Sequence, residues 1–186
     1  MRTLIVTEFV TLDGVMEAPG GEETHPHTNW VGEYMGKEEA EYKVTETVEA
    51  ETLLIGRVTY ESFAGAWPER KGELADKLNS MPKVLVSSTI TDPEWENTTV
   101  LGGDVVAGVS ELKAGDGGSV LVNGSATLVH TLLDNDLVDE LRLMVFPVSI
   151  GGGLRVFPDS RKRTPWTLAD TLTFPSTVRV DTYHPG

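Results

Sequence analysis

The 186-residue sequence contains no cysteine, and this absence excludes a disulfide scaffold, a thiolate zinc site, an iron–sulfur cluster and a cysteine nucleophile. Basic residues are also scarce, because 15 Lys and Arg stand against 29 Asp and Glu, which gives a formal net charge of −14. Nucleic-acid-binding proteins gather Lys and Arg into one patch, whereas the cations here are scattered along the chain. We therefore expect no nucleic-acid partner.

Long apolar runs are missing too. No stretch approaches the roughly 20 apolar residues that cross a bilayer, and the first ten residues alternate like a strand instead of forming the core of a signal peptide. We therefore expect a cytoplasmic protein without a membrane partner. Apolar residues make up 39% of the chain, which is ordinary for a globular protein, and the length predicts one domain over residues 1–186.

Short apolar segments alternate with amphipathic ones along the chain. Strand patterns occur at residues 2–10, 52–55, 82–86, 98–101, 119–122, 139–148, 166–174 and 177–183. Helical patterns occur at residues 33–51, 58–65, 72–80 and 105–112, and in a last helix that Ser125 caps. This order predicts an α/β fold with a mostly parallel sheet, helices on both faces and an antiparallel C-terminal edge. We expect the long loop of residues 14–30 to act as a lid.

Three of the expected strands end in small or polar residues that suit a phosphate. These strand ends are Gly56-Arg57, Ser87-Ser88 and Gly124-Ser125. Ligands of open α/β sheets bind at the carboxyl ends of the strands, and a helix N-terminus that follows a glycine favours an anion. Each strand end also has a purely structural explanation as a turn, a loop or a helix cap. Their order on successive strands favours a ligand with several phosphates, such as a dinucleotide.

Other chemistries find less support. The sequence has no G-x-G-x-x-G opening a helix, no phosphate-binding G-x-x-x-x-G-K-[ST] and no G-x-S-x-G nucleophile elbow. His25 and His27 are potential metal ligands, but the surrounding Gly-, Pro- and Glu-containing loop offers no arranged set of further ligands. We therefore expect no metal site.

Five motifs follow one another along residues 3–157. They are Thr11-Leu12-Asp13-Gly14, Leu54-Ile55-Gly56-Arg57-x-Thr59-Tyr60-Glu61, Lys83-Val84-Leu85-Val86-Ser87-Ser88, Asn123-Gly124-Ser125-Ala126-x-Leu128, and a tail from Leu137 to Phe157 that contains Pro147 and Gly151-Gly152-Gly153. In this order they resemble the reductase domain of bacterial riboflavin-biosynthesis deaminase-reductases, in a stand-alone form. The resemblance implies the three-layer fold of dihydrofolate reductase, an enzyme that binds its cofactor in the same way as these reductase domains.

The resemblance also implies an NADPH site. Its expected parts are Gly56, Arg57 and Thr59 at the phosphates, Ser87 and Ser88 at the adenine ribose and its 2′-phosphate, Gly124, Ser125 and Ala126 at the pyrophosphate with Leu128 behind them, and Leu12, Asp13 and Gly14 at the nicotinamide. Two departures matter. The opening Ser of the first motif is Thr11 here, and the sequence contains neither the H-x-E nor the C-x-x-C motif of the companion deaminase domain. The riboflavin pathway's ribose-phosphate substrate is therefore not implied.

These observations predict an NADPH-dependent oxidoreductase that reduces a small heterocyclic, pterin- or pyrimidine-like substrate. The alternative is a nucleotide-binding or interaction protein that keeps the fold without catalysis. The proton donor is not identified by the sequence. Asp13 and Glu33 are the candidates we retain, although the acidic residues of the 33–51 helix are typical of a solvated face. Relatives of this kind often pair, so we expect a homodimer.

Overall fold

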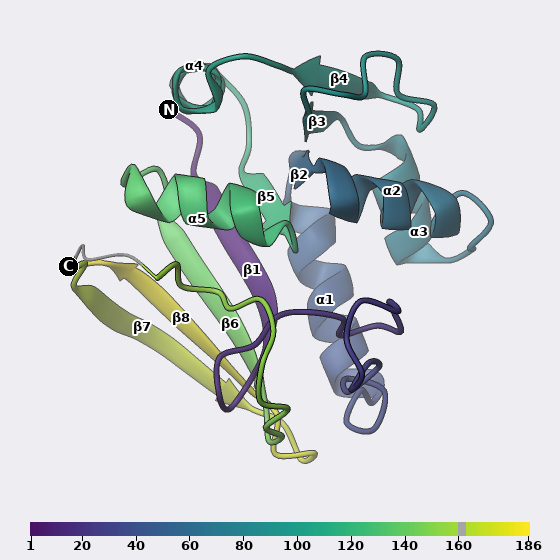
Figure 1. Cartoon of the computed structure of the whole chain (residues 1–186), viewed down its shortest axis with the longest axis vertical. Coiled ribbons are helices and arrows are strands. Elements are labelled where there is room, and N and C mark those ends of the chain that lie inside the picture. The colour runs from purple at the N-terminus through teal and green to yellow at the C-terminus, as the bar shows by residue number, and fades with distance from the viewer. Residues whose placement is uncertain (160–162) are drawn as a thin grey trace.

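The computed structural model describes residues 1–159 and 163–186. Within them the chain forms one eight-stranded sheet in the order β4-β3-β2-β5-β1-β6-β8-β7, with helices on both of its faces (Figure 1). The strands are β1 (Leu4–Thr11), β2 (Thr52–Gly56), β3 (Lys83–Val86), β4 (Thr98–Leu101), β5 (Val120–Asn123), β6 (Glu140–Phe146), β7 (Trp166–Thr173) and β8 (Arg179–Pro185). The helices are α1 (Lys37–Glu49), α2 (Arg57–Ala66), α3 (Glu73–Ser80), α4 (Val105–Ala114) and α5 (Ala126–Asp134).

The predicted sheet is confirmed. Strands β1 to β6 pair in parallel, and β8 then pairs antiparallel with both β6 and β7. Because successive side chains of a strand point to opposite faces, Leu4 and Val6 of β1 join a cluster that includes α4 and α5. Ile5 joins the opposite cluster with α2 and α3. Both faces of the central strands are thus buried, which accounts for their nearly continuous apolar sequences.

The sheet splits at the carboxyl end of β1. Residues 4–7 of β1 pair with β5, but residues 8–11 continue alone on that side, paired only with β6. Strand β5 ends at Asn123, because Gly124 adopts the left-handed conformation with φ 60° and turns the chain into α5. A gap therefore opens between the end of β1 and the ends of β5 and β2.

One expected boundary shifts for a local reason. The helix predicted from residue 33 begins at Lys37, because Gly36 takes the N-cap position in an extended conformation. Glu33 therefore lies in the preceding turn, where it is exposed. The loop of residues 14–30 is fastened to the body of the protein, since Val15 bridges to Arg155 and the buried Trp30 ring packs edge-on against Phe146 of β6, with the ring centroids 5.4 Å apart. No helix in the described ranges is long and apolar enough to cross a membrane.

Candidate functional site

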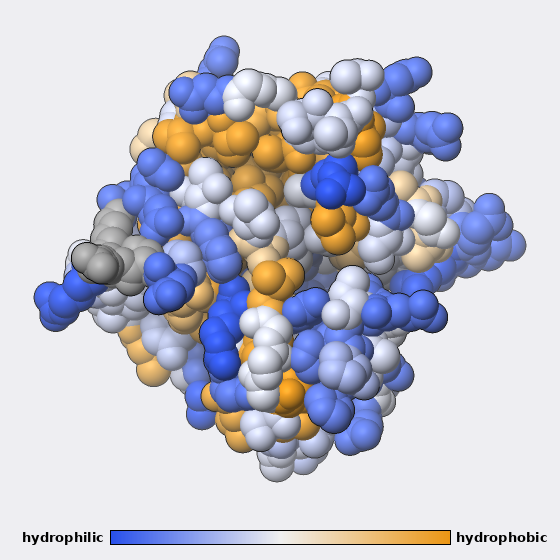
Figure 2. Space-filling model, in the orientation of Figure 1, coloured by the Kyte–Doolittle hydropathy of each residue, from blue (hydrophilic) through white to orange (hydrophobic). Residues whose placement is uncertain are grey.

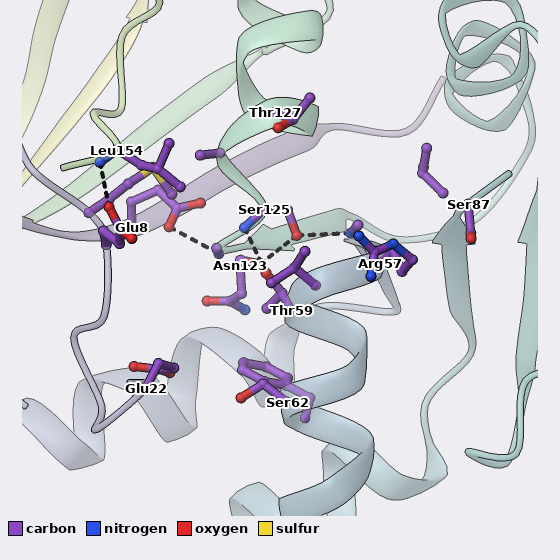
Figure 3. A pocket seen from close by; sticks show the side chains of 18 of the residues that line it. Glu8, Glu22, Arg57, Thr59, Ser62, Ser87, Asn123, Ser125, Thr127 and Leu154 are labelled. Carbon is purple, nitrogen blue, oxygen red and sulfur yellow. Dashed lines mark hydrogen bonds between the residues drawn. The ribbon is translucent and has the colours of Figure 1, made fainter. Parts of the chain in front are cut away.

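A pocket of about 760 Å³ occupies the gap in the sheet (Figure 3). This volume falls within the range of about 300–1,000 Å³ that is typical of small-molecule sites. Eight of the twelve residues expected at a cofactor line it, namely Gly56, Arg57, Thr59, Ser87, Ser88, Gly124, Ser125 and Ala126. The structure therefore gathers three strand ends that lie far apart in the sequence around one cavity.

Two of these strand ends are fastened to each other. The Ser125 hydroxyl accepts a hydrogen bond from the Gly56 amide at 2.8 Å, and the Thr59 hydroxyl accepts one from the Ser125 amide at 2.9 Å (Figure 3). Gly124 packs closely in the same turn, because a Cβ there would lie 3.0 Å from Thr59 Cγ2 and Oγ1. The turns that follow β2 and β5 thus form one rigid wall of the pocket.

The same wall presents two helix N-termini whose amides have no side-chain cap. Helix α2 follows Gly56, which has no side chain, and α5 follows Ser125, whose hydroxyl is turned to the Gly56 amide. The prediction that Ser125 caps its helix is therefore wrong, although the residue does occupy the N-cap position. In contrast, Asp104 caps α4 by accepting from the Ala107 amide at 3.0 Å. Uncapped amides and the positive ends of two helix dipoles favour an anion here.

Arg57 and Ser87 lie at one end of the pocket, opposite Glu8 (Figure 3). The Arg57 guanidinium forms an ion pair with Glu61 at 2.9 Å, and both side chains are about half exposed, at 45% and 52%. A pair this exposed contributes little to stability, so the guanidinium is free to exchange partners. The Ser87 hydroxyl accepts from the Ile90 amide at 2.9 Å and so also shapes its own turn.

Apolar side chains complete this end of the pocket. Val58, Val86, Leu101 and Val105 line it, and Figure 2 shows apolar surface gathered in the region where Figure 1 draws α4 and β4. An apolar wall beside hydroxyls and a guanidinium suits a flat base attached to a phosphorylated sugar.

Lys83, which the sequence places near the serines, does not face the pocket. Its ammonium donates to the carbonyl oxygens of Leu78, Asn79 and Met81 at 2.8, 3.1 and 2.8 Å. It also lies 4.4 Å from the centre of the Trp95 ring. Burial lowers the pKa of Lys83 to about 8. This lysine therefore closes the C-terminal end of α3.

Four expected cofactor residues are not on the pocket wall. Leu128 is buried in the core, whereas Leu12, Asp13 and Gly14 form the turn after β1. The Asp13 carboxylate accepts from the Thr11 hydroxyl at 2.6 Å and from the Gly151 amide at 2.8 Å. The hydroxyl, together with the amides of the glycine loop, lowers the pKa of Asp13.

Neither retained candidate for the proton donor therefore reaches the cavity. Asp13 fastens the turn after β1 to the glycine loop, and Glu33 lies outside the pocket lining. The metal candidates also have local roles. The His27 amide donates to His25 Nδ1 at 3.0 Å, and His25 Nε2 lies 2.7 Å from the Gly152 carbonyl oxygen. No cluster of three or more potential metal ligands occurs among the described residues.

Glu8 is a pocket residue that the sequence interpretation missed. Its Oε2 accepts from the Gly124 amide at 3.0 Å, and its side chain is buried, with 4% exposed. Its Oε1 is the one buried side-chain nitrogen or oxygen without a hydrogen-bond partner in the described part of the chain. Burial raises the pKa of Glu8 well above its ordinary value, although Lys43 and the Gly124 amide oppose this. The available signal was a single carboxylate in an otherwise apolar strand face.

A charged network borders the same part of the pocket. Lys43 donates to the Thr7 hydroxyl at 3.0 Å and forms a short ion pair with Glu46. The second oxygen of Glu46 pairs with Arg142 at 3.2 Å. Burial alone would raise the pKa of Glu46, but the two cations outweigh burial and lower it. Lys43 is therefore held by a buried carboxylate on its own helix.

Comparisons with known proteins agree with this architecture. The RibD C-terminal domain family matches residues 2–180. The uncharacterized protein YyaP of Bacillus subtilis (strain 168) is 29% identical over 191 residues, which cover 98% of this chain and 95% of YyaP.

Two solved structures share the fold. A putative riboflavin biosynthesis protein from Shewanella sp. PV-4 has a TM-score of 0.77 at 22% identity and covers 99% of both chains. Dihydrofolate reductase from Enterococcus faecalis, solved with NADP(H), has a TM-score of 0.64 at 15% identity, covering 99% of this chain and 96% of its own. The sheet order and the solved structures show that the chain has the fold of dihydrofolate reductase. The family match over residues 2–180 shows that the chain belongs to the RibD C-terminal domain family.

Proposed function

We propose that the protein is an NADPH-dependent reductase that delivers a hydride to a small heterocyclic, pterin- or pyrimidine-like substrate. One observation carries this proposal, namely the two uncapped helix N-termini that are fastened together at the wall of a single large pocket. The family's reductases and the dihydrofolate reductase solved with NADP(H) support it.

The residues on the pocket wall fit a dinucleotide. The uncapped first turns of α2 and α5 offer backbone amides to a pyrophosphate, and Gly56 and residues 124–126 leave room for it because they carry no bulky side chain. An added Cβ at Gly124 would meet Thr59. Arg57, Ser87 and Ser88 offer a guanidinium and hydroxyls to the phosphorylated ribose. The bound cofactor would supply a hydride, while the chain orients the reactants and keeps water out.

The other part of the pocket suits the substrate. Phe63 and Trp67 of the α2 region line it, and residues 16–20 of the long loop close it from the opposite side. Aromatic walls bury a flat heterocycle well. Because the loop is fastened at Val15 and Trp30, we propose that it shields the reacting groups from water.

Thermal melts test the cofactor. NADPH at about 100 times its dissociation constant should stabilise the fold by about 2.7 kcal/mol, which corresponds to roughly 5–10 °C for a chain of this size. Absence of a shift would reject the proposal. Absorbance at the dihydronicotinamide band then reports turnover with 7,8-dihydropterin and a panel of related pterins and pyrimidines. Binding of NADPH without turnover across this panel would favour the non-catalytic alternative.

The homodimer stays a prediction. Strand β7 is an edge of the sheet, pairs with β8 alone among the described strands, and exposes Leu168 and Leu172. Unprotected edge strands favour pairing with another chain. Sedimentation velocity of the wild type and of a Leu172→Lys variant should show a dimer and a monomer, respectively, and a monomeric wild type would reject this prediction.

A further inference from the structure

The split in the sheet brings a buried carboxyl group to the pocket. Glu8 is the first residue of β1 beyond its last pair with β5, so its neighbour on that side is the turn and no longer a strand. That turn supplies one hydrogen bond, from the Gly124 amide to Oε2 at 3.0 Å. Oε1 has no partner among residues 1–159 and 163–186, although Glu8 is only 4% exposed. A buried oxygen without a partner costs free energy unless a ligand or a proton satisfies it.

The nearest cation is held back from this carboxyl group. Lys43 would favour the charged form of Glu8, but no ion pair between them occurs in the described structure, because Lys43 is bonded to Glu46 and Thr7. Thr7 also points to the opposite face of β1 from Glu8. Arg142 forms an ion pair with the second oxygen of Glu46. The buried environment therefore leaves Glu8 without a counter-ion and favours its protonated form.

The other acidic residues on the pocket wall are already satisfied. Glu17 Oε2 accepts from the Leu154 amide at 2.9 Å, and Glu22 Oε2 accepts from the Gly20 amide at the same distance. Both bonds lie at the surface. Neither residue combines burial with a free oxygen.

Resting on the proposed function, we infer that Glu8 is the proton donor of the reduction, and that its carboxyl group donates to the electronegative atom of a polarised C=N or C=O bond in the substrate. The carbon of that bond receives the hydride with its electron pair, and the π electrons move to the nitrogen or oxygen. The Glu8 O–H bond breaks as a new N–H or O–H bond forms, and its electrons remain on the carboxylate. Water then restores the proton. The substrate class is therefore one that presents a hydrogen-bond acceptor to Glu8.

The first measurement needs no turnover. Carbon-13 NMR of the full chain, labelled at the glutamate carboxyl groups, follows the titration of each carboxyl, and the resonance that Glu8→Gln removes is that of Glu8. We expect it to titrate well above the ordinary range of glutamate. Glu46→Gln should lower its midpoint, because the change removes a nearby negative charge and frees Lys43. A Glu8 resonance that titrates within the ordinary range of glutamate would overturn the inference.

The second measurement is the reduction of 7,8-dihydropterin by NADPH. Loss of a positioned general acid costs about 10²–10⁴-fold in rate, so Glu8→Gln should lower kcat by at least 100-fold. The wild-type rate should fall as pH rises through the Glu8 midpoint, and the rate of Glu8→Gln should not follow that profile. Affinity for NADPH should change less than threefold, as measured by fluorescence titration. An unchanged rate and pH profile in Glu8→Gln would overturn the inference.

Glu39→Gln is the matched control. Glu39 is also a buried glutamate, but it lies outside the pocket and bonds to the Gly36 amide and the Ser176 hydroxyl. A glutamine can keep the bond to Gly36, so this variant should keep its rate and pH profile. The readouts separate the two proposals. Absence of NADPH binding in the wild type overturns the proposed function, whereas normal binding with a Glu8 that titrates in the ordinary range of glutamate overturns only its role as the acid.

Discussion

Replacement of Gly124 by alanine perturbs the wall of the pocket at one atom. Gly124 has φ 60°, a left-handed conformation that L residues adopt at a cost of roughly 1–2 kcal/mol. The new Cβ would also lie 3.0 Å from Thr59 Cγ2 and Oγ1, and such overpacking costs about 1–3 kcal/mol. We therefore expect Gly124→Ala to lower the free energy of unfolding by about 2–5 kcal/mol. In the folded variant, NADPH binding should weaken by more than the loss of stability alone explains.

Two further variants separate these terms. Gly151 has φ 88°, and an alanine Cβ there would have no neighbour within 4 Å, so Gly151→Ala should show the backbone cost alone. Thr59→Ser removes Cγ2 but keeps the hydroxyl that accepts from the Ser125 amide. Combined with Gly124→Ala, it should recover roughly 1 kcal/mol, which a double-mutant cycle reports as a coupling energy.

Urea unfolding at pH 7, followed by circular dichroism, measures all four variants. The reasoning about close packing fails if Gly124→Ala costs no more than Gly151→Ala, or if the cycle shows no coupling with Thr59. Equal NADPH affinity in folded Gly124→Ala would remove this turn from the proposed cofactor site, even where the stability terms agree.

Three further predictions concern charged groups. NADPH should bind at least tenfold tighter than NADH. Arg57→Ala should remove most of this preference, and Glu61→Gln should increase it because the guanidinium loses its ion-pair partner. Equal dissociation constants for the two cofactors in the wild type would contradict this. Glu46→Gln should cost about 3–5 kcal/mol at neutral pH. The pKa of Glu46 is lower in the folded state than in the unfolded state. Its contribution to the free energy of unfolding should therefore be complete above the unfolded-state pKa and disappear as the pH falls through the folded-state pKa, which urea unfolding at several pH values would show. The wild type should become more stable relative to Lys83→Met as the pH rises from about 8, because Lys83 has released its proton in the folded state but still holds it in the unfolded chain. A difference in free energy of unfolding that does not change with pH would refute this.

Much of the fold follows from local sequence patterns. The apolar runs at residues 52–55 and 119–122 lack a polar face, and both became central strands buried on two sides. The alternation of strands and helices predicted the parallel order, and the last two strands predicted the antiparallel edge. The start of α1 was missed because Glu33 extends the acidic, helix-like composition of residues 37–49 towards the N-terminus, whereas Gly36 sets the actual boundary.

The site is only partly readable from the sequence, because its shape depends on register. Small residues at the ends of β2 and β5 indicated an anion, and the structure brings them to one pocket. The pairing between β1 and β5 ends at Thr7. This end point depends on the register of the two strands, which cannot be read from the sequence of either strand alone. In the sequence, Glu8 therefore stands out only as a charged residue on an otherwise apolar strand face. In the same way, nothing local distinguishes a free Arg57 from one paired with Glu61.

The position of the proposed acid on a strand has a consequence for how the site works. A carboxyl on a helix is placed by the docking of that helix, whereas Glu8 is placed by pairing of β1 with β6 and by the Gly124 amide. The same turn, through Ser125 and Thr59, positions the amides that face the proposed pyrophosphate. A shift of this turn therefore changes anion binding and the hydrogen bond to Glu8 together. The short segment of residues 123–126 thus couples the cofactor half of the pocket to the group that we propose as its acid.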